Sequence, residues 1–429
     1  MALENYEKDM MRCNRCSYCK WVPHEVMKDA RFLGVCPSIE EYNFHSRSAS
    51  GRLITALSLL KERIDLNDAS RDTIYQCQMC GGCDVSCKVE RDLEPYEIMQ
   101  ELRFRCVEKG VVPPEHLKIV DSLKRDANAM GKPKADRGNW ADGLGVKYLG
   151  KEEADVLFHA GCQYSFDESL WSTAKNGLNL LLNAGVDVGI MGKSEVCCGG
   201  RSYELGFKDV LTQFAKRNIK LWETAGVKTV VTPCADCYQT FKVLYDKIGE
   251  KTDVEILHIT EFIHRLIKEG KIKLTKEIPL NVTYHDPCHL GRLADPWIHW
   301  EGEEKKVFGQ MIVHDPPKEK RFGLNGVYDV PREILKAIPG LKLTEMHRIR
   351  EYAWCCGSGS GVKEAYPDFA ESTAAKRIEE ARSVGAEALV SSCPWCKNNF
   401  ESCATETGDN IQVYDIIDLV QQAMEKEEN

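Results

Sequence analysis

Two stretches in the N-terminal third place apolar residues at the spacing of an amphipathic helix. They are SGRLITALSLLKERIDL at residues 50–66 and EPYEIMQELRFRCVEKG at residues 94–110, and the second ends on a glycine that can cap a helix. The following segment, 112–150, is rich in Pro, Gly, Asp and Lys, which is typical of a linker. The pattern therefore predicts a pair of helices followed by a connecting segment.

Beyond that segment, short apolar strands alternate with helical stretches, and the whole arrangement occurs twice. ADVLFHAGC (154–162) matches LNVTYHDPC (280–288), because each is a strand with a histidine three residues before a cysteine. Each copy then has Cys-Cys-Gly, at 197–199 and 355–357, and closes with a strand that runs into a C-x-x-C motif. Alternating strands and helices predict α/β units with parallel strands, and such folds bind ligands at the carboxyl ends of the strands.

The spacing of the motifs supports a duplication. From the first cysteine of Cys-Cys-Gly to the first cysteine of C-x-x-C, the two copies count 37 and 38 residues. From the single cysteine to Cys-Cys-Gly they count 35 and 67 residues, so the second copy carries 32 extra residues. We expect this insertion within 297–326, where it could line or cap a cavity. The predicted fold is α+β overall, with an α-helical domain (1–111), a linker (112–153), a first repeat (154–279) and a second repeat (280–429).

Composition sets limits on the class of protein. The chain has 429 residues, of which 43% are hydrophobic and 29% charged, as in globular proteins that fold in water. A formal charge of −9 argues against nucleic acid as the main partner and against general attraction to anionic lipid. There is neither an apolar run of membrane-spanning length nor an apolar secretion signal at the N-terminus, so we expect a cytoplasmic protein without direct membrane insertion.

Twenty cysteines are the one unusual feature of this composition. A long chain without a secretion signal is expected in a reducing compartment, where thiols stay free, so grouped cysteines indicate metal binding. Cys106 and Cys403 stand apart from the groups. The other eighteen cysteines form four groups: Cys13, Cys16, Cys19 and Cys36; Cys77, Cys80, Cys83 and Cys87; Cys162, Cys197, Cys198, Cys234 and Cys237; Cys288, Cys355, Cys356, Cys393 and Cys396.

The two N-terminal groups have the spacing of iron–sulfur ligands. Each includes three cysteines at i, i+3 and i+6, and three such thiols can surround one cubane cluster if a fourth comes from elsewhere. In bacterial two-cluster ferredoxins the fourth cysteine of a run serves the other cluster. We therefore expect Cys87 to complete the first run and Cys36 to complete the second, although Lys88 replaces the usual proline. Zinc, which prefers two pairs of cysteines, is the less favoured alternative.

Each repeat gathers five thiols, one more than a cubane cluster or tetrahedral zinc requires. Adjacent cysteines also pair poorly in a disulfide, because a single peptide link does not give the required Cα separation. An adjacent pair can instead hold two irons close together, since each sulfur can bind a different iron or bridge two. Five thiols per repeat thus indicate a cluster other than a closed cube.

The double motif resembles the CCG-domain family and is similar to the catalytic part of heterodisulfide reductase, in the fused form that joins a ferredoxin-like part to two CCG repeats. The resemblance covers nearly all of residues 11–403. It implies two cubane [4Fe–4S] clusters in a ferredoxin-like domain and a noncubane [4Fe–4S] cluster in each repeat, with both noncubane clusters facing a shared cavity where a disulfide is cleaved. The implied noncubane ligands are Cys162, Cys197, Cys198, Cys234 and Cys237 in the first repeat, and Cys288, Cys355, Cys356, Cys393 and Cys396 in the second.

Other residues near the motifs have weaker signals. His159 and His285 recur in the repeat, and we expect them to lie beside a cluster or cap a helix rather than to transfer protons. His289 and Arg292 fit either contact with an anionic substrate or an ordinary surface role. Trp395, inside C-P-W-C, could shield a cluster from water.

These observations predict an iron–sulfur oxidoreductase subunit that passes electrons through two cubanes to two noncubane clusters, which reduce a disulfide-type substrate. No flavin or quinone motif is visible, so the electron donor is expected to be a flavoprotein, another iron–sulfur subunit or a membrane cytochrome. The alternative is a pure electron-transfer subunit of a large anaerobic complex, resembling those of tungsten-dependent benzoyl-CoA reductases. A zinc-stabilised interaction protein is a third interpretation.

Overall fold

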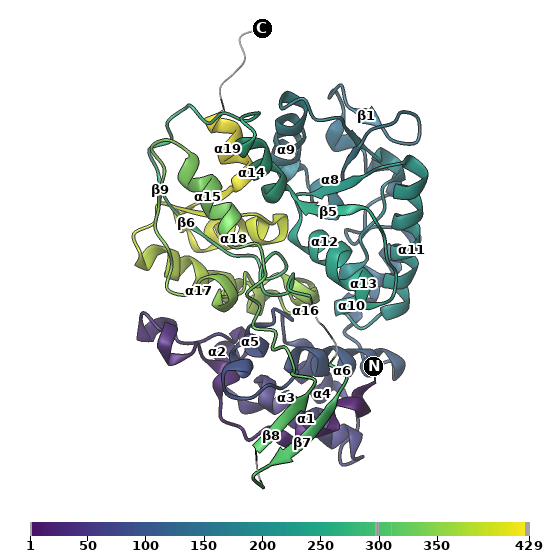
Figure 1. Cartoon of the computed structure of the whole chain (residues 1–429), viewed down its shortest axis with the longest axis vertical. Helices are drawn as coiled ribbons and strands as arrows, with labels where there is room; N and C mark the ends of the chain where they lie inside the picture. The colour runs from purple at the N-terminus through teal and green to yellow at the C-terminus, as the bar shows by residue number, and fades with distance from the viewer. Residues whose placement is uncertain (1, 297, 299, 310, 425–429) are drawn as a thin grey trace.

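The computed structural model describes residues 2–424, apart from positions 297, 299 and 310 (Figure 1). Its N-terminal part is helical, and the helices are α1 (Glu7–Arg12), α2 (Pro37–Tyr42), α3 (Ala49–Leu60), α4 (Asp68–Tyr75), α5 (Gly82–Glu90) and α6 (Pro95–Glu108). The two helices that the apolar spacing predicted are α3 and α6, which pack against each other. Leu53 of α3 and Leu102 of α6 are buried in their shared core. The predicted helix over 50–66 ends earlier than expected, at Leu60.

The segment predicted as a linker is well structured. It contains helix α7 (Pro114–Asp126) and strand β1 (Lys147–Tyr148). Pro113 and Pro114, which suggested a connecting segment, lie at the start of this helix instead. A proline fits the first turn of a helix, because the N–H that it lacks would have no partner within the helix there. Ile119 and Leu123 of α7 are buried in the core of the first repeat, so this segment is part of the folded domain.

Two parallel sheets follow. The first has the strand order β1-β3-β2-β4-β5, with β2 (Val156–Phe158), β3 (Val188–Ile190), β4 (Thr229–Thr232) and β5 (Glu255–His258). The second has the order β11-β10-β6-β9, with β6 (Asn281–Tyr284), β9 (Lys342–Leu343), β10 (Ala388–Ser391) and β11 (Gln412–Asp415). If β1 is set aside, β2 lies between β3 and β4 with β5 at the outer edge, and in the same way β6 lies between β9 and β10 with β11 at the outer edge. Identical topology confirms the prediction of two duplicated α/β units.

Helices connect the strands of each sheet. In the first repeat they are α8 (Gly161–Phe166), α9 (Trp171–Asn183), α10 (Gly200–Glu204), α11 (Lys208–Ala225), α12 (Ala235–Gln239), α13 (Tyr245–Lys247) and α14 (Ile259–Lys268). In the second they are α15 (Asp329–Ala337), α16 (Val362–Ala365), α17 (Pro367–Ser383), α18 (Pro394–Thr407) and α19 (Ile416–Ala423). Contacts between α9 and α19 and between α14 and α15 join the repeats, and these two contacts are equivalent in a pseudo-twofold arrangement. One apolar core extends across both repeats.

The insertion in the second repeat includes an antiparallel hairpin, β7 (Glu303–Val307) and β8 (Met311–Asp315). Three positions of the predicted range 297–326 lie outside the described residues. The hairpin extends to the N-terminal helices and lies beside α1 (Figure 1), where Glu304 pairs with Lys8 and with Arg12. The insertion therefore contacts the N-terminal domain. Within the described part of the chain, no helix has both the length and the apolar character needed to span a bilayer.

Candidate iron–sulfur sites

The structure brings the four cysteines of the first expected N-terminal site together. Cys13, Cys16, Cys19 and Cys87 line a single small cavity of about 20 Å³ with the apolar side chains of Leu53 and Leu93. Cys19 and Cys87 are buried, whereas Cys16 is exposed. Burial raises the pKa of the Cys19 thiol, and the neighbouring Cys13 and Cys16 raise it further. Four thiols around one mostly apolar space suit a cubane cluster.

The second N-terminal set lies next to the first. Cys36 is buried, which raises its pKa to about 12, and its nearest titratable neighbours include Cys77 and Cys80. Cys83 interacts with Cys36, Cys77 and Cys80 and also with Cys19 of the first set. Each run of three cysteines therefore lies beside the fourth cysteine of the other run: Cys87 is beside the first run, and Cys36 is beside the second.

The unusual Lys88 has a local explanation. It lies inside helix α5, whose hydrogen bonding continues to Glu90, and a proline there would interrupt the helix. Its ammonium group is buried and pairs with Glu94 and Asp92. Burial opposes this charge, but Asp84, Glu94 and Asp92 raise the pKa of Lys88 well above its usual value. The lysine therefore fixes the loop after α5 and leaves Cys87 free to face the cavity.

In each repeat, all five cysteines follow the carboxyl ends of parallel strands. The single cysteine comes after β2 or β6, the Cys-Cys-Gly motif after β3 or β9, and C-x-x-C after β4 or β10. The first cysteine of each C-x-x-C, Cys234 or Cys393, is the N-cap of the next helix, α12 or α18. Helix N-termini favour negative charge, which suits thiolate ligands. The strands thus bring residues that are distant in sequence to one place.

The five thiols interact in the same order in both repeats. In the first repeat, neighbouring thiols interact in the order Cys162, Cys197, Cys198, Cys237 and Cys234. In the second repeat, the equivalent order is Cys288, Cys355, Cys356, Cys396 and Cys393. The pKa of Cys198 is lowered well below its usual value because the thiols of Cys197 and Cys237 donate to its sulfur. The pKa of Cys356 is lowered in the same way by its two neighbours. In each set, the second cysteine of the adjacent pair is therefore the more easily ionised of the two.

The glycine of Cys-Cys-Gly has the same role in both copies. The N–H groups of Gly199 and Gly357 each donate to the sulfur two residues earlier, at 3.4 Å. Their φ angles are +84° and +98°, which side chains rarely adopt. A Cβ at Gly199 would lie 2.8 Å from Cβ of Phe214, and one at Gly357 would overlap the carbonyl oxygen of Ala370. Both positions therefore require glycine.

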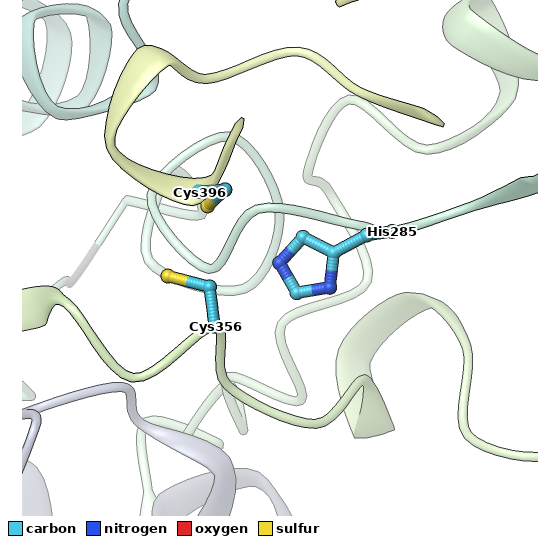
Figure 2. Close-up of side chains that lie close together, drawn as sticks. All are labelled: His285, Cys356 and Cys396. Carbon is cyan, nitrogen blue, oxygen red and sulfur yellow. The ribbon is translucent and has the colours of Figure 1, made fainter. Parts of the chain in front are cut away.

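A histidine lies beside the five-cysteine set of the second repeat, as the repeat suggested. His285, Cys356 and Cys396 have ligand atoms within 4.8 Å of one another, and Figure 2 shows the ring beside the two thiols. Arg377 donates from Nε to Nδ1 of His285 at 3.2 Å, so Nδ1 is the acceptor and Nε2 carries the proton. Burial lowers the pKa of His285 and keeps the ring neutral.

The second ring nitrogen provides a test of whether a cluster fits. Nε2 of His285 and Nε2 of His159 are both buried and have no nitrogen or oxygen partner within the described part of the protein. At His285 this nitrogen carries the proton, and a buried N–H without an acceptor is costly, so sulfide or thiolate sulfur is a suitable acceptor there. The five-cysteine set of the second repeat therefore fits a sulfur-rich group, and His285 would donate to it.

Arg137 is a site residue that the sequence analysis missed. It belongs to the segment interpreted as a linker, and its Nη2 donates to Sγ of Cys162 at 3.1 Å. Its Nη1 donates to Oε1 of Glu195 at 2.6 Å, and both side chains are almost fully buried. Burial opposes the charge of Arg137, but Cys162 and Glu195 raise its pKa above the usual value. No motif marks this arginine, because its partner is 25 residues away in sequence.

The four sets are not isolated from one another. The thiol of Cys234 in the first repeat interacts with that of Cys393 in the second. The thiol of Cys80 in the N-terminal domain interacts with that of Cys355. One buried cluster of side chains contains Cys19, Cys80, Cys83, Cys288 and Cys355. The sets thus form a continuous series from the N-terminal domain through the second repeat to the first.

His289 and Arg292 lie inside this series, so the surface role considered for them is wrong. Arg292 is buried, and its guanidinium donates to the carbonyl oxygens of Cys80, Glu351 and Ala353. It therefore joins the N-terminal domain to the second repeat. His289 contacts Glu204 and Asp236 of the first repeat at 2.6 and 3.1 Å.

Trp395 also lies between the repeats, half-buried, with the guanidinium carbon of Arg201 4.2 Å from the centre of its ring. The two ungrouped cysteines have apolar surroundings. Cys106 is buried among the side chains of the N-terminal core, and Cys403 is buried in the core of the second repeat. Their burial among apolar residues agrees with their separation from the four groups.

Comparisons with known proteins agree with this geometry. The cysteine-rich (CCG) domain family matches residues 156–242 and 282–401, and the 4Fe-4S dicluster domain family matches residues 9–90. The D subunit of the dihydromethanophenazine:CoB–CoM heterodisulfide reductase of Methanosarcina mazei is 30% identical over 423 residues, covering 96% of this chain and 93% of that protein.

Two larger proteins are also similar. The probable iron-sulfur-binding oxidoreductase FadF of Bacillus subtilis is 29% identical over 94% of this chain and 53% of its own length. The EtfAB:quinone oxidoreductase of Syntrophomonas wolfei is 29% identical over 82% of this chain and 47% of its own length. This chain therefore spans about half of each. The chain belongs to the family of heterodisulfide reductase D subunits, iron–sulfur electron-transfer proteins in which a 4Fe–4S dicluster domain precedes two CCG domains.

Proposed function

We propose that this chain binds two cubane and two noncubane [4Fe–4S] clusters and delivers electrons to a disulfide-type substrate between its two repeats. The cubane ligands would be the two crossed N-terminal sets, and each noncubane cluster would be held by one five-cysteine set. The observation that supports this most strongly is the contact of Cys234 with Cys393, because it puts the two five-cysteine sets side by side. A partner subunit, either a flavoprotein or another iron–sulfur protein, would supply the electrons.

The order of the sets supports one route of transfer, for which we propose an inward direction. The site with Cys16 lies at the surface and would receive electrons first. The second N-terminal set would be next, because Cys83 interacts with Cys19. Cys80 then leads to Cys355, and the first repeat would be the end of the route.

When bound, the clusters would supply single electrons at neighbouring positions. Reduction of a disulfide takes two electrons and two protons, breaks the S–S bond and releases two thiols. The chain itself holds the ligands, keeps water away from ten buried cysteines and donates hydrogen bonds to sulfur from Gly199 and Gly357, and His285 would donate to a bound cluster. Arg137 would balance negative charge at the first repeat.

A second function is favoured by one observation. All ten cysteines of the repeats are at most 9% exposed, so a bulky substrate has no direct path to them without movement. A relay that passes electrons to another subunit needs no such path. In this case the chain would serve as an electron-transfer subunit of a larger complex, such as an aromatic acyl-CoA reductase.

Cluster content and disulfide turnover test the proposal together. Anaerobically reconstituted protein is expected to hold roughly sixteen irons if each of four sites binds a four-iron cluster. With reduced methyl viologen as donor, the protein should reduce a disulfide. Cys197→Ser or Cys355→Ser should abolish turnover while the N-terminal clusters remain reducible by dithionite. Cys403→Ser is the matched control and should keep both iron content and turnover.

The outcomes separate the alternatives. About eight irons in the intact protein, or zinc in the repeats, would contradict the noncubane assignment. A full set of clusters without any disulfide turnover would favour the relay. Turnover that survives both Cys197→Ser and Cys355→Ser would exclude the repeats as the place of reaction.

A further inference from the structure

The first N-terminal set opens onto the protein surface at Cys16. Of the twenty cysteines, all of which lie in the described part of the chain, Cys16 is the one that is exposed. The five-cysteine sets are buried, and so are most thiols of the second N-terminal set. If the sites hold clusters, this opening is the shortest path between a cluster and a protein bound from outside.

Basic side chains surround the opening. Arg15 precedes Cys16 and is exposed, and Lys20 and His45 lie close enough for Arg15 and Lys20 to lower the pKa of His45, after the effect of burial. Arg91 lines the same small cavity as the cysteines, is 47% exposed and pairs with Glu90 at 3.8 Å. In the part of the chain that the structure describes, neither Arg15 nor Lys20 forms an ion pair. These positive charges are therefore available to a partner.

The inserted hairpin adds an apolar border to the same region. It is held there by Glu304, which accepts from Arg12 at 2.7 Å, next to Cys13. A cavity of about 520 Å³ between the hairpin and the N-terminal domain is lined by Arg91, which also lines the cysteine cavity. The charged lining of this second cavity is mixed, with Asp9, Glu90, Asp92, Glu94 and Glu304 beside Lys8, Arg12, Arg91 and Lys318, so the uncompensated positive charge lies at Arg15 and Lys20. On the hairpin, Phe308 and Met311 are 93% and 52% exposed. Apolar side chains this exposed are available for contact with another protein.

The charge of the surroundings makes this basic region distinctive. The chain has a formal charge of −9, so an acidic protein is repelled by the molecule as a whole and attracted only where positive charge is concentrated. Electrostatic complementarity of this kind raises the rate of encounter and orients the partner. Small, weak interfaces are usual between electron-transfer proteins, so a few charges beside one exposed thiol are sufficient.

We propose that the surface formed by Arg15 and Lys20 beside Cys16, bordered by the β7–β8 hairpin, docks an acidic one-electron carrier protein. This inference rests on the proposed function, because it needs a cluster at Cys16. One electron passes between the carrier and that cluster, so the carrier is oxidised by one electron when the cluster is reduced. The apolar tip of the hairpin contacts the rim of the carrier, and the basic side chains face acidic groups around its redox centre.

Stopped-flow kinetics with the reconstituted full chain tests the inference. The donor is a reduced plant-type [2Fe–2S] ferredoxin, an acidic carrier with a potential near about −400 mV. Arg15→Glu/Lys20→Glu should lower the second-order rate constant by about tenfold or more at low salt, because steering accounts for about 10- to 1,000-fold in such pairs. Lys151→Glu/Arg217→Glu, which changes the net charge equally on exposed residues of another region, is the control and should lie within about twofold of the wild type.

Salt provides a second measurement. The wild-type rate constant should fall as ionic strength rises from about 0.05 to about 0.3 M, while that of Arg15→Glu/Lys20→Glu should not. Equal rate losses in the two double variants, or a wild-type rate that rises with salt, would overturn the docking inference. Iron content and the extent of reduction by dithionite separate failure of the proposed function from failure of the docking inference. A protein without iron at the N-terminal sites contradicts the proposed function itself. A fully loaded protein whose double variant Arg15→Glu/Lys20→Glu has unchanged kinetics contradicts only the docking surface.

Discussion

Loss of the positive charge at Arg137 is expected to lower the reduction potential of the cluster in the first repeat. Arg137 Nη2 lies 3.1 Å from Sγ of Cys162, and its other partners are Glu195 and the carbonyl oxygen of Ala127. Reduction adds negative charge beside this guanidinium, so the arginine stabilises the reduced state more than the oxidised one. Arg137→Met removes the charge and keeps a side chain of similar length.

The size of the shift follows from Coulomb's law. Two unit charges about 4 Å apart interact by about 4 kcal/mol at an effective dielectric constant of about 20. An added electron is shared over a whole cluster, much of which is farther away, so we take about half of this value. A change of about 1.4 kcal/mol corresponds to about 59 mV for one electron, and the expected decrease is therefore about 80 mV.

The buried Glu195 affects the interpretation of the Arg137→Met variant and provides a control for it. Without Arg137 its carboxylate has lost its cationic partner, and breaking a buried ion pair typically costs about 3–5 kcal/mol of stability. The double variant Arg137→Met/Glu195→Gln removes both charges and should shift the potential much less. Arg137→Lys keeps the charge and should stay near the wild-type potential, although it loses the forked geometry of the guanidinium.

The assay is a redox titration followed by EPR, with iron analysis of each variant. Arg137→Met with full iron content and an unchanged potential would refute the reasoning. So would a double variant that shifts as far as the single one, because the effect would then not come from charge. Activity is not needed for this measurement, since potential and iron content are read from the resting protein.

Further predictions concern the ligands and the motif. Cys36→Ser should disturb the cluster of the second N-terminal run and leave the cluster at Cys16 intact, as seen by EPR; loss of the Cys16 signal alone would contradict the crossed arrangement. Gly357→Ala should lose the iron of the second repeat, because its Cβ would overlap a backbone oxygen, and normal iron content would show that the loop adjusts. Phe308→Ser, at a side chain that is 93% exposed, should leave thermal stability unchanged and slow only electron exchange with the acidic carrier; a lower melting temperature would show that the hairpin tip has a structural role.

The sequence by itself determined the local features. The periodicity of apolar residues located α3 and α6, and the repeated strand, Cys-Cys-Gly and C-x-x-C motifs identified two α/β units of the same topology. These features are readable because strands, helices and closely spaced cysteines depend on neighbours in the chain. The segment before β2 was misread, since prolines end one element or begin another, and composition does not tell which. Helix α7 begins at such a proline.

Tertiary structure alone decided how the sets relate to one another. Sequence spacing brings Cys234 near Cys237, but the contact of Cys234 with Cys393 depends on the pseudo-twofold packing of α9 with α19 and α14 with α15. In the same way, Arg137 reaches Cys162 only because its segment folds onto the first sheet. Contacts between residues far apart in the chain depend on how whole surfaces pack. Local patterns in a single sequence identify the residues that pack, but they do not show which distant residues will contact one another.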